Sequence, residues 1–382
     1  MKIAILKERR ADEKRCAATP DTVKKYVGMN AAVVIEAGAG ETAAIADAAF
    51  AAAGATIVPD AATAIAGADL ILKVQRPLIE GEGGPDELAG AKQGAFLAAI
   101  LNPHGAKESL DAYAARGVNA FAMELMPRIT RAQSMDVLSS QSNLAGYKAV
   151  IDAAGVFGRA FPMMMTAAGT VAPARVLIMG VGVAGLQAIA TARRLGAIVS
   201  ATDVRPATKE QVESLGATFV AVEDEEFKQA ETAGGYAKQM SEAYQAKQAA
   251  LIAETIKKQD IVITTALIPG RKAPVLVSED MVKSMKLGSV IVDLAVEQGG
   301  NCPLSEAGKV VVKHGVTLVG HNNVPSRVAV DATALYARNL LNFVTLLVDK
   351  ESKELKVNWE DEIVKGVALT RDGAVIHPMF KA

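Results

Sequence analysis

One segment of the sequence has residue types and spacing that are typical of phosphate binding. It follows an apolar run, 176–179, and precedes a helical run, 186–195. In such a strand–turn–helix context the first glycine allows a tight turn, the second lets the backbone approach a pyrophosphate, and the third lets the helix pack on the strand. The helix N-terminus favours the anion. The segment is a complete GxGxxG pattern made of Gly180, Val181, Gly182, Val183, Ala184 and Gly185.

An acidic residue stands where a dinucleotide-binding turn needs one. Asp203 ends the next predicted strand, about twenty residues after the glycines, where a carboxylate accepts hydrogen bonds from ribose hydroxyls. A carboxylate also repels a 2′-phosphate, so the pattern favours NAD(H) over NADP(H). Val204 and Arg205 belong to the same predicted site, and Arg205 could instead contact a 2′-phosphate.

Three further segments are open to a functional and a structural interpretation. Gly38–Ala43 fits a loosened GxGxxA pattern, but its glutamate would lie beside a bound pyrophosphate, which favours a structural turn. The polar segment Arg128–Asp136 could surround a nicotinamide and its ribose, or it could be a solvated linker. Gly234–Tyr236 lies in a polar stretch, 223–248, that exceeds a typical connection. It is either a mobile lid or a plain surface loop.

Other kinds of site have little support in the sequence. Cys16 and Cys302 form no CxxC pair, and no histidine stands at metal-ligand spacing from another histidine or a cysteine. We therefore expect no disulfide framework and no metal, and we find no GxSxG nucleophile motif. The net charge of −1, with scattered lysines and arginines, argues against nucleic-acid partners. The two unpaired cysteines favour a reducing cytoplasm, and no signal peptide and no membrane-spanning stretch is expected.

The surrounding pattern predicts an α/β fold. The 382 residues are 51% hydrophobic, which suffices for two domains with separate cores. Short apolar runs alternate with alanine-rich helical runs, so we expect two Rossmann-like doubly wound domains with mainly parallel sheets. The predicted strands are 3–6, 33–36, 56–58, 69–74, 120–124, 175–179, 198–203, 218–222, 261–265, 290–295 and 316–319.

The second domain is expected to be inserted into the first. A predicted helix at 139–161 crosses to the second domain, and another at about 326–347 returns. Thr19-Pro20-Asp21 predicts a helix start, and 364–370 followed by 374–377 predicts a hairpin in the tail. The predicted domains are residues 1–138 with 322–382, and the NAD(H)-binding residues 139–321.

Long and specific segments, which span essentially the whole chain, carry a family resemblance. Among them are KERRADEKRCAATP, AMELMPRITRAQSMDVLSSQSNLAGY, GVGVAGLQAIATARRLGA, TDVR, ETAGGYAKQM, TTALIPG, VIVDLAVEQGGNCP and GHNNVPSR. They resemble the NAD(H)-binding component (domain I) of proton-translocating nicotinamide nucleotide transhydrogenases. Alanine dehydrogenase is the relative in fold.

The resemblance implies a complex. This component would hold NAD(H), a second component NADP(H), and a membrane component would carry protons while hydride passes between NADH and NADP⁺. The resemblance also implies a homodimer. Because the chain ends at Ala382 without membrane helices, it resembles the separate alpha-1 subunit of the three-subunit form. We therefore expect it on the cytoplasmic face of the inner membrane, attached through its partners.

The resemblance further implies roles for individual residues. RITRAQSMD matches the family loop that places the nicotinamide, so Arg128, Gln133 and Asp136 take the positioning role, with Gln133 facing the partner's nucleotide. No acid or base is expected, because the hydride passes directly between two rings. GYAKQM matches a mobile loop, which gives Tyr236 the lid role. The other implied cofactor contacts are Ser134, Met135, Ser139, Gly235, Gln248, Thr265, Ala266 and Leu267.

Two alternatives remain at this point. Arg15 and Lys73 match the positions at which alanine dehydrogenase binds its amino acid. However, Ile100 aligns with that enzyme's histidine and Glu297 with its DQGG aspartate, and losing a general acid–base should cost roughly 10²–10⁴-fold in rate. A non-catalytic NAD sensor shares the glycine turn and Asp203, but it does not explain a polar loop that would expose the nicotinamide edge.

Overall fold

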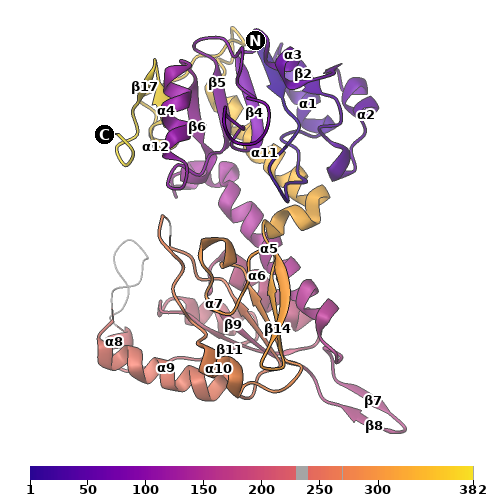
Figure 1. Ribbon diagram of the computed structural model, residues 1–382, viewed down its shortest axis with the longest axis vertical. Helices are drawn as coiled ribbons and strands as arrows, with labels where there is room; N and C mark the ends of the chain where they lie inside the picture. Colours follow the sequence, from indigo (N-terminus) through magenta and orange to yellow (C-terminus); the bar gives the residue numbers. More distant parts are fainter. Residues whose placement is uncertain (229–239, 269, 382) are drawn as a thin grey trace. The chain divides into compact units, whose positions relative to one another are not determined.

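The computed structural model describes residues 1–228, 240–268 and 270–381, and the chain divides into two compact units (Figure 1). Unit 1 comprises Met1–Gln141 and Pro325–Ala382, and unit 2 comprises Ser142–Val324. Helix α5 (Val137–Val156) begins in unit 1 and ends in unit 2.

Unit 1 is built on a six-stranded parallel sheet with the strand order β3-β2-β1-β4-β5-β6. Its strands are β1 (Lys2–Ile5), β2 (Ala32–Glu36), β3 (Thr56–Val58), β4 (Leu70–Gln75), β5 (Phe96–Ile100) and β6 (Asn119–Ala122). Its helices are α1 (Pro20–Gly28), α2 (Asp47–Ala52), α3 (Ala61–Ile65), α4 (Lys107–Ala115), α11 (Ala329–Leu347) and α12 (Glu362–Val367). Short 3₁₀ turns lie at η1 (Glu41–Ala43), η2 (Met123–Leu125), η3 (Thr130–Met135) and η5 (Val324–Val328).

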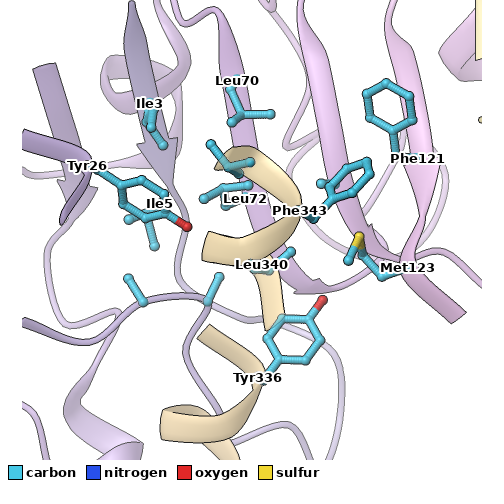
Figure 2. Packing of buried hydrophobic residues seen from close by; sticks show 14 of the residues in the cluster. Ile3, Ile5, Tyr26, Leu70, Leu72, Phe121, Met123, Tyr336, Leu340 and Phe343 are labelled. Carbon is cyan, nitrogen blue, oxygen red and sulfur yellow. The ribbon is translucent and has the colours of Figure 1, made fainter. Parts of the chain in front are cut away.

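Helix α11 supplies much of the core on one face of this sheet. Figure 2 shows Tyr336, Leu340 and Phe343 of α11 facing buried residues of the strands. The Phe343 ring meets Phe121 of β6 edge to face at 5.3 Å between centroids. Each such side chain, fully buried, stabilises the fold by roughly 1.5–3 kcal/mol. This packing explains why the returning helix, predicted for the first domain, belongs to unit 1.

The helix start predicted at Thr19-Pro20-Asp21 is confirmed. The Thr19 hydroxyl accepts from the Thr22 backbone N–H, and the Thr22 hydroxyl accepts from the Thr19 backbone N–H. Pro20 occupies the first turn, where its missing N–H costs nothing. Sequence and local structure agree here because every group involved is close in the chain.

Unit 2 repeats the architecture with a seven-stranded sheet in the order β11-β10-β9-β12-β13-β15-β14, in which only the last pair is antiparallel. Its strands are β9 (Arg175–Met179), β10 (Ile198–Thr202), β11 (Thr218–Phe219), β12 (Ile261–Thr264), β13 (Val290–Asp293), β14 (Lys309–Lys313) and β15 (Val316–Gly320). Its helices are α6 (Val183–Arg194), α7 (Thr208–Ser214), α8 (Glu225–Lys228), α9 (Glu242–Ile256) and α10 (Glu279–Ser284), with a 3₁₀ turn at η4 (Val296–Gln298).

The two sheets confirm the expected α/β class with mainly parallel strands. In each sheet the chain order reverses beside the first strand, between β1 and β4 in unit 1 and between β9 and β12 in unit 2. Ligands of open parallel sheets bind outside the carboxyl ends of the strands at such a switch point. In unit 2 the GxGxxG segment directly follows β9, so it lies at this edge.

Several elements differ from the sequence-based expectation. The predicted tail strand 364–370 is wrong for most of its length, because Glu362–Val367 forms α12, whose start is capped by Asp361. Only the short pair β16 (Thr370–Arg371) and β17 (Ala374–Val375) forms a hairpin. Ile363, Val364 and Val367 are buried at helical spacing, which explains the helix. Strands β5 and β14 and the hairpin of β7 (Met164–Thr166) with β8 (Gly169–Val171) were not predicted.

Candidate nucleotide-binding site

The three glycines after β9 differ in what surrounds them. Gly180 has a φ of +102°, which side-chain-bearing residues rarely adopt. A Cβ at Gly182 would meet nothing within 4 Å, whereas a Cβ at Gly185 would lie 1.9 Å from the Gly180 carbonyl oxygen. The turn therefore needs a glycine at position 180 for its positive φ and a glycine at position 185 for the close packing of helix and strand. Gly182 leaves open space beside the turn.

Helix α6 begins at this open space. Gly182 is its N-cap and has no capping side chain, and Gly182 and Val183 are exposed. The first N–H groups of a helix have no partner within it and attract anions. A second helix packs closely here, because a Cβ at Gly146 of α5 would lie 2.0 Å from the Ala184 carbonyl oxygen. Gly146 was not among the predicted site residues, although a glycine within a long predicted helix is a usable signal.

Asp203 follows β10 and is tied to the glycine turn. Its Oδ2 accepts from the Val181 backbone N–H at 2.7 Å, and its Oδ1 accepts from the Arg205 backbone N–H at 2.9 Å. The Arg205 guanidinium donates to both oxygens, from Nε at 2.9 Å and from Nη2 at 3.0 Å. The structure therefore brings Asp203 to the turn, as expected, and adds an ion pair that the sequence did not indicate.

Further predicted contacts of unit 2 lie after β12 and β10 and on α9. The Thr265 hydroxyl donates to the Gly180 carbonyl at 3.0 Å, which fixes the end of β12 against the turn. Ala266 exchanges two hydrogen bonds with the fully buried Asn301 amide, at 3.1 and 2.9 Å. Gln248 of α9 donates to the Thr202 hydroxyl at 3.2 Å. Leu267 and Val204 are about half exposed, so both are apolar surfaces open to a ligand.

The RITRAQSMD loop lies in unit 1 and forms η3. The side chains of Arg128, Gln133 and Ser134 are exposed, whereas Met135 is buried. Asp136 accepts from the Ser139 backbone N–H at 2.9 Å and also from its hydroxyl. This carboxylate therefore caps the start of α5, which makes it a group that shapes the loop.

Residues that the sequence analysis did not select hold this loop in place. Asn339 and Asn342 of α11 both donate to the Ser134 carbonyl at 2.9 Å. Arg131 forms a two-pronged ion pair with Asp361, at 2.7 and 2.9 Å. The two asparagines interrupt the apolar run of α11, and in the sequence that interruption was the available signal that they have polar partners.

Some predicted residues cannot be placed or play other parts. Gly235 and Tyr236 lie outside the described residues. Gly38 has a φ of +73° and is followed only by the short 3₁₀ turn η1, so no helix begins there whose N-terminus could bind an anion.

Among residues 1–228, 240–268 and 270–381, no three histidine, cysteine or acidic side chains form a group that could hold a metal. No helix in that part of the chain is long and apolar enough to cross a membrane.

Comparison with known proteins decides the family. The models described as the N-terminal and C-terminal domains of alanine dehydrogenase/PNT match residues 4–145 and 149–378. A relative from Rhodospirillum rubrum, named as a portion of NAD(P) transhydrogenase subunit alpha, is 63% identical over 99% of this chain and 98% of its own length. The chain belongs to this family.

Two further relatives separate the branches of the alanine dehydrogenase/PNT family. The crystal structure of transhydrogenase from Sinorhizobium meliloti matches with a TM-score of 0.89 at 55% identity, covering 98% of this chain and 100% of that one. Alanine dehydrogenase of Halomonas elongata is 32% identical over 92% of this chain and 88% of its own. The transhydrogenase branch is therefore much the nearer, as the resemblance implied.

Residues at the alanine dehydrogenase-like positions are buried in ion pairs. Arg15 and Lys73 are 2% and 1% exposed. The Arg15 fork donates to both oxygens of Glu13 at 2.8 and 2.7 Å, and Lys73 Nζ donates to Glu87 at 2.7 Å. Burial raises the pKa of the adjacent Glu8 to about 7, although the charge of Lys73 opposes the rise. Each cation thus has an internal carboxylate, which a substrate carboxylate would have to displace.

At the position of the alanine dehydrogenase histidine this chain has no proton-transfer group. Ile100 ends β5, and an aliphatic side chain there can neither give nor take a proton. Glu297 of η4 accepts from the Asn323 backbone N–H at 2.9 Å. The histidine position thus holds no proton donor, and the glutamate position accepts a backbone hydrogen bond.

Proposed function

We propose that this chain is the NAD(H)-binding component of a proton-translocating transhydrogenase, and that hydride passes between its nucleotide and NADP(H) held by a partner component. The arrangement of the glycine turn carries the proposal. Gly182 leaves open space at the N-terminus of α6, and Asp203 is hydrogen-bonded to the same turn. A pyrophosphate fits the first and a ribose the second. When bound, reduced nicotinamide supplies the hydride.

In this proposal the residues of each unit have separate tasks. In unit 2 the N-terminus of α6 binds the pyrophosphate and Asp203 binds the ribose. The exposed side chains of Val204 and Leu267 contact apolar parts of the nucleotide. In unit 1 the loop is held by Asn339 and Asn342, and the family resemblance gives its Gln133 and Arg128 the role of positioning the nicotinamide. Direct hydride transfer from a positioned nicotinamide ring needs no protein acid or base, which agrees with the lack of a proton donor at Ile100.

The first test is nucleotide choice. The chain should bind NADH well above NADPH in a fluorescence titration, because Asp203 accepts from ribose hydroxyls and repels a 2′-phosphate. Asp203→Ala should weaken NADH binding by about 1–3 kcal/mol, the cost of losing a hydrogen bond to a charged group. Asp280→Ala, at an exposed surface carboxylate of unit 2, should leave binding unchanged. Equal affinity of the wild type for both nucleotides would remove the basis for the Asp203 role.

A second test addresses the alanine dehydrogenase alternative. Pyruvate, ammonia and NADH should give no turnover, because Ile100 cannot move a proton and both Arg15 and Lys73 are already paired with carboxylates. Absorbance at the NADH band would follow the reaction, with an authentic alanine dehydrogenase as positive control. Consumption of NADH that depends on both pyruvate and ammonia would establish the alternative.

We also propose that the chain acts as a homodimer, attached to the cytoplasmic face of the inner membrane through the membrane component. The β7–β8 hairpin, which projects from unit 2 in Figure 1, supports a dimer contact. Met163, Met164 and Met165 are exposed there, and an apolar projection of this kind is typical of an interface.

The dimer has its own test. Met165→Lys should shift the chain towards monomer in light scattering, because the charge would be buried without a partner. Leu287→Lys, at another exposed apolar residue of unit 2, should leave the mass unchanged. A wild-type monomer at all concentrations would reject the dimer.

A further inference from the structure

The carboxylate of Asp203 has no unused hydrogen-bonding capacity. Its Oδ1 accepts from the backbone N–H and from Nε of Arg205, and its Oδ2 accepts from Nη2 of Arg205 and from the Val181 backbone N–H. A carboxylate offers about four lone-pair positions. A ribose hydroxyl that donates to Asp203 must therefore displace one of these donors.

The guanidinium of Arg205 is the donor that can move. The Val181 and Arg205 backbone N–H groups are fixed by the turn and by the chain. The Arg205 side chain, in contrast, is 30% exposed, whereas that of Asp203 is 7% exposed. Its Nη2 also donates to the Val181 carbonyl at 3.2 Å, so the guanidinium lies beside the glycine turn. A cation at this place is suited to a phosphate on the adjacent ribose.

We propose that Arg205 is a masked receptor for the 2′-phosphate of a dinucleotide, and that Asp203 excludes NADP(H) partly by keeping this guanidinium engaged. The planar fork of arginine matches a phosphate as well as a carboxylate. Asp203 thus acts twice, by repelling the phosphate and by occupying its receptor. This inference rests on the proposed NAD(H) site and concerns which residues set its selectivity.

The test compares NADPH binding in two variants that differ only at Arg205. Asp203→Asn keeps an oxygen acceptor for the Val181 N–H but removes the charge that holds Arg205. Calorimetric titration should show that Asp203→Asn binds NADPH at least about tenfold tighter than Asp203→Asn/Arg205→Leu, the gain of a charged hydrogen bond to phosphate. Arg205→Leu alone should bind NADPH as poorly as the wild type, because Asp203 still repels the phosphate.

The outcomes separate this inference from the proposed function. Equal NADPH affinity of Asp203→Asn and the double variant, with wild-type NADH binding intact, would overturn the role of Arg205 and leave repulsion alone. A wild-type chain that binds neither nucleotide would instead defeat the proposed function. Asp203→Ser provides a second uncharged background, in which the same comparison decides the question if Asp203→Asn does not fold.

Discussion

Gly182→Ala should weaken NADH binding by roughly 100-fold, equivalent to about 2.7 kcal/mol, while leaving the stability of the chain nearly unchanged. The new Cβ meets no atom within 4 Å, and the backbone at Gly182 has a φ of −81°, which alanine adopts freely. The methyl group would, however, fill the space that a pyrophosphate needs to approach the first N–H groups of α6. The substitution therefore separates binding from folding.

Gly185→Ala supplies the contrast. Its Cβ would lie 1.9 Å from the Gly180 carbonyl oxygen, so strand and helix must separate. Overpacking of this kind costs about 1–3 kcal/mol of stability, and it displaces the turn as well. NADH titration and thermal unfolding of both variants measure the two effects. Gly155→Ala, in an open position on α5, serves as control. Normal NADH binding by Gly182→Ala would contradict the assignment of the turn.

Hydride exchange in a mixture with an NADP(H)-binding component should be fast, whereas this chain alone should oxidise NADH negligibly, with or without free NADP⁺. The reason is that the second nucleotide must be held at the same time, with the two rings within roughly 3–3.5 Å. In the described residues, unit 2 has one convincing dinucleotide turn, and the glycine turn of unit 1 leads only into η1. The acceptor must therefore be delivered by a partner.

Gln133→Asn should slow this exchange severalfold or more while NADH affinity stays nearly constant. The loop around Gln133 is fixed through the Ser134 carbonyl and Arg131, so shortening one exposed side chain leaves the fold intact. It changes only the group available to orient a ring, and small misplacements are costly in rate. Gln93→Asn, at another exposed glutamine of unit 1, is the matched control. A normal exchange rate in Gln133→Asn would assign the loop to structure alone.

The parts of the fold that could be predicted are those that depend on local sequence. The Thr19 cap, the alternation of strands and helices, and the glycine turn after β9 involve neighbouring residues, and the structure has all three. The tail was misjudged because the Asp372-Gly373 turn suggested a hairpin, whereas Ile363, Val364 and Val367 lie at helical spacing after the Asp361 cap. The edge strand β14 was missed because its three consecutive valines, flanked by lysines, face little core.

The candidate site could be predicted in its residues but not in their pairings. Asp203 stood at the right distance from the glycines, yet nothing in TDVR showed that Arg205 would occupy its carboxylate. Asn339 and Asn342 are about 200 residues from Ser134, so their hydrogen bonds depend on the tertiary fold. The pairing of Arg15 with Glu13 was not predicted either, because two residues two apart in an irregular segment need not meet.

A single-turnover stopped-flow experiment tests the central claim most directly. This chain, saturated with NADH, is mixed with the NADP(H)-binding component, saturated with NADP⁺, in the absence of any membrane component, and both occupancies are measured beforehand. We predict a rapid burst of NADPH formation that requires both proteins, that persists in Gln93→Asn and that is slowed in Gln133→Asn. The absence of a burst, with both nucleotides demonstrably bound, would contradict the account.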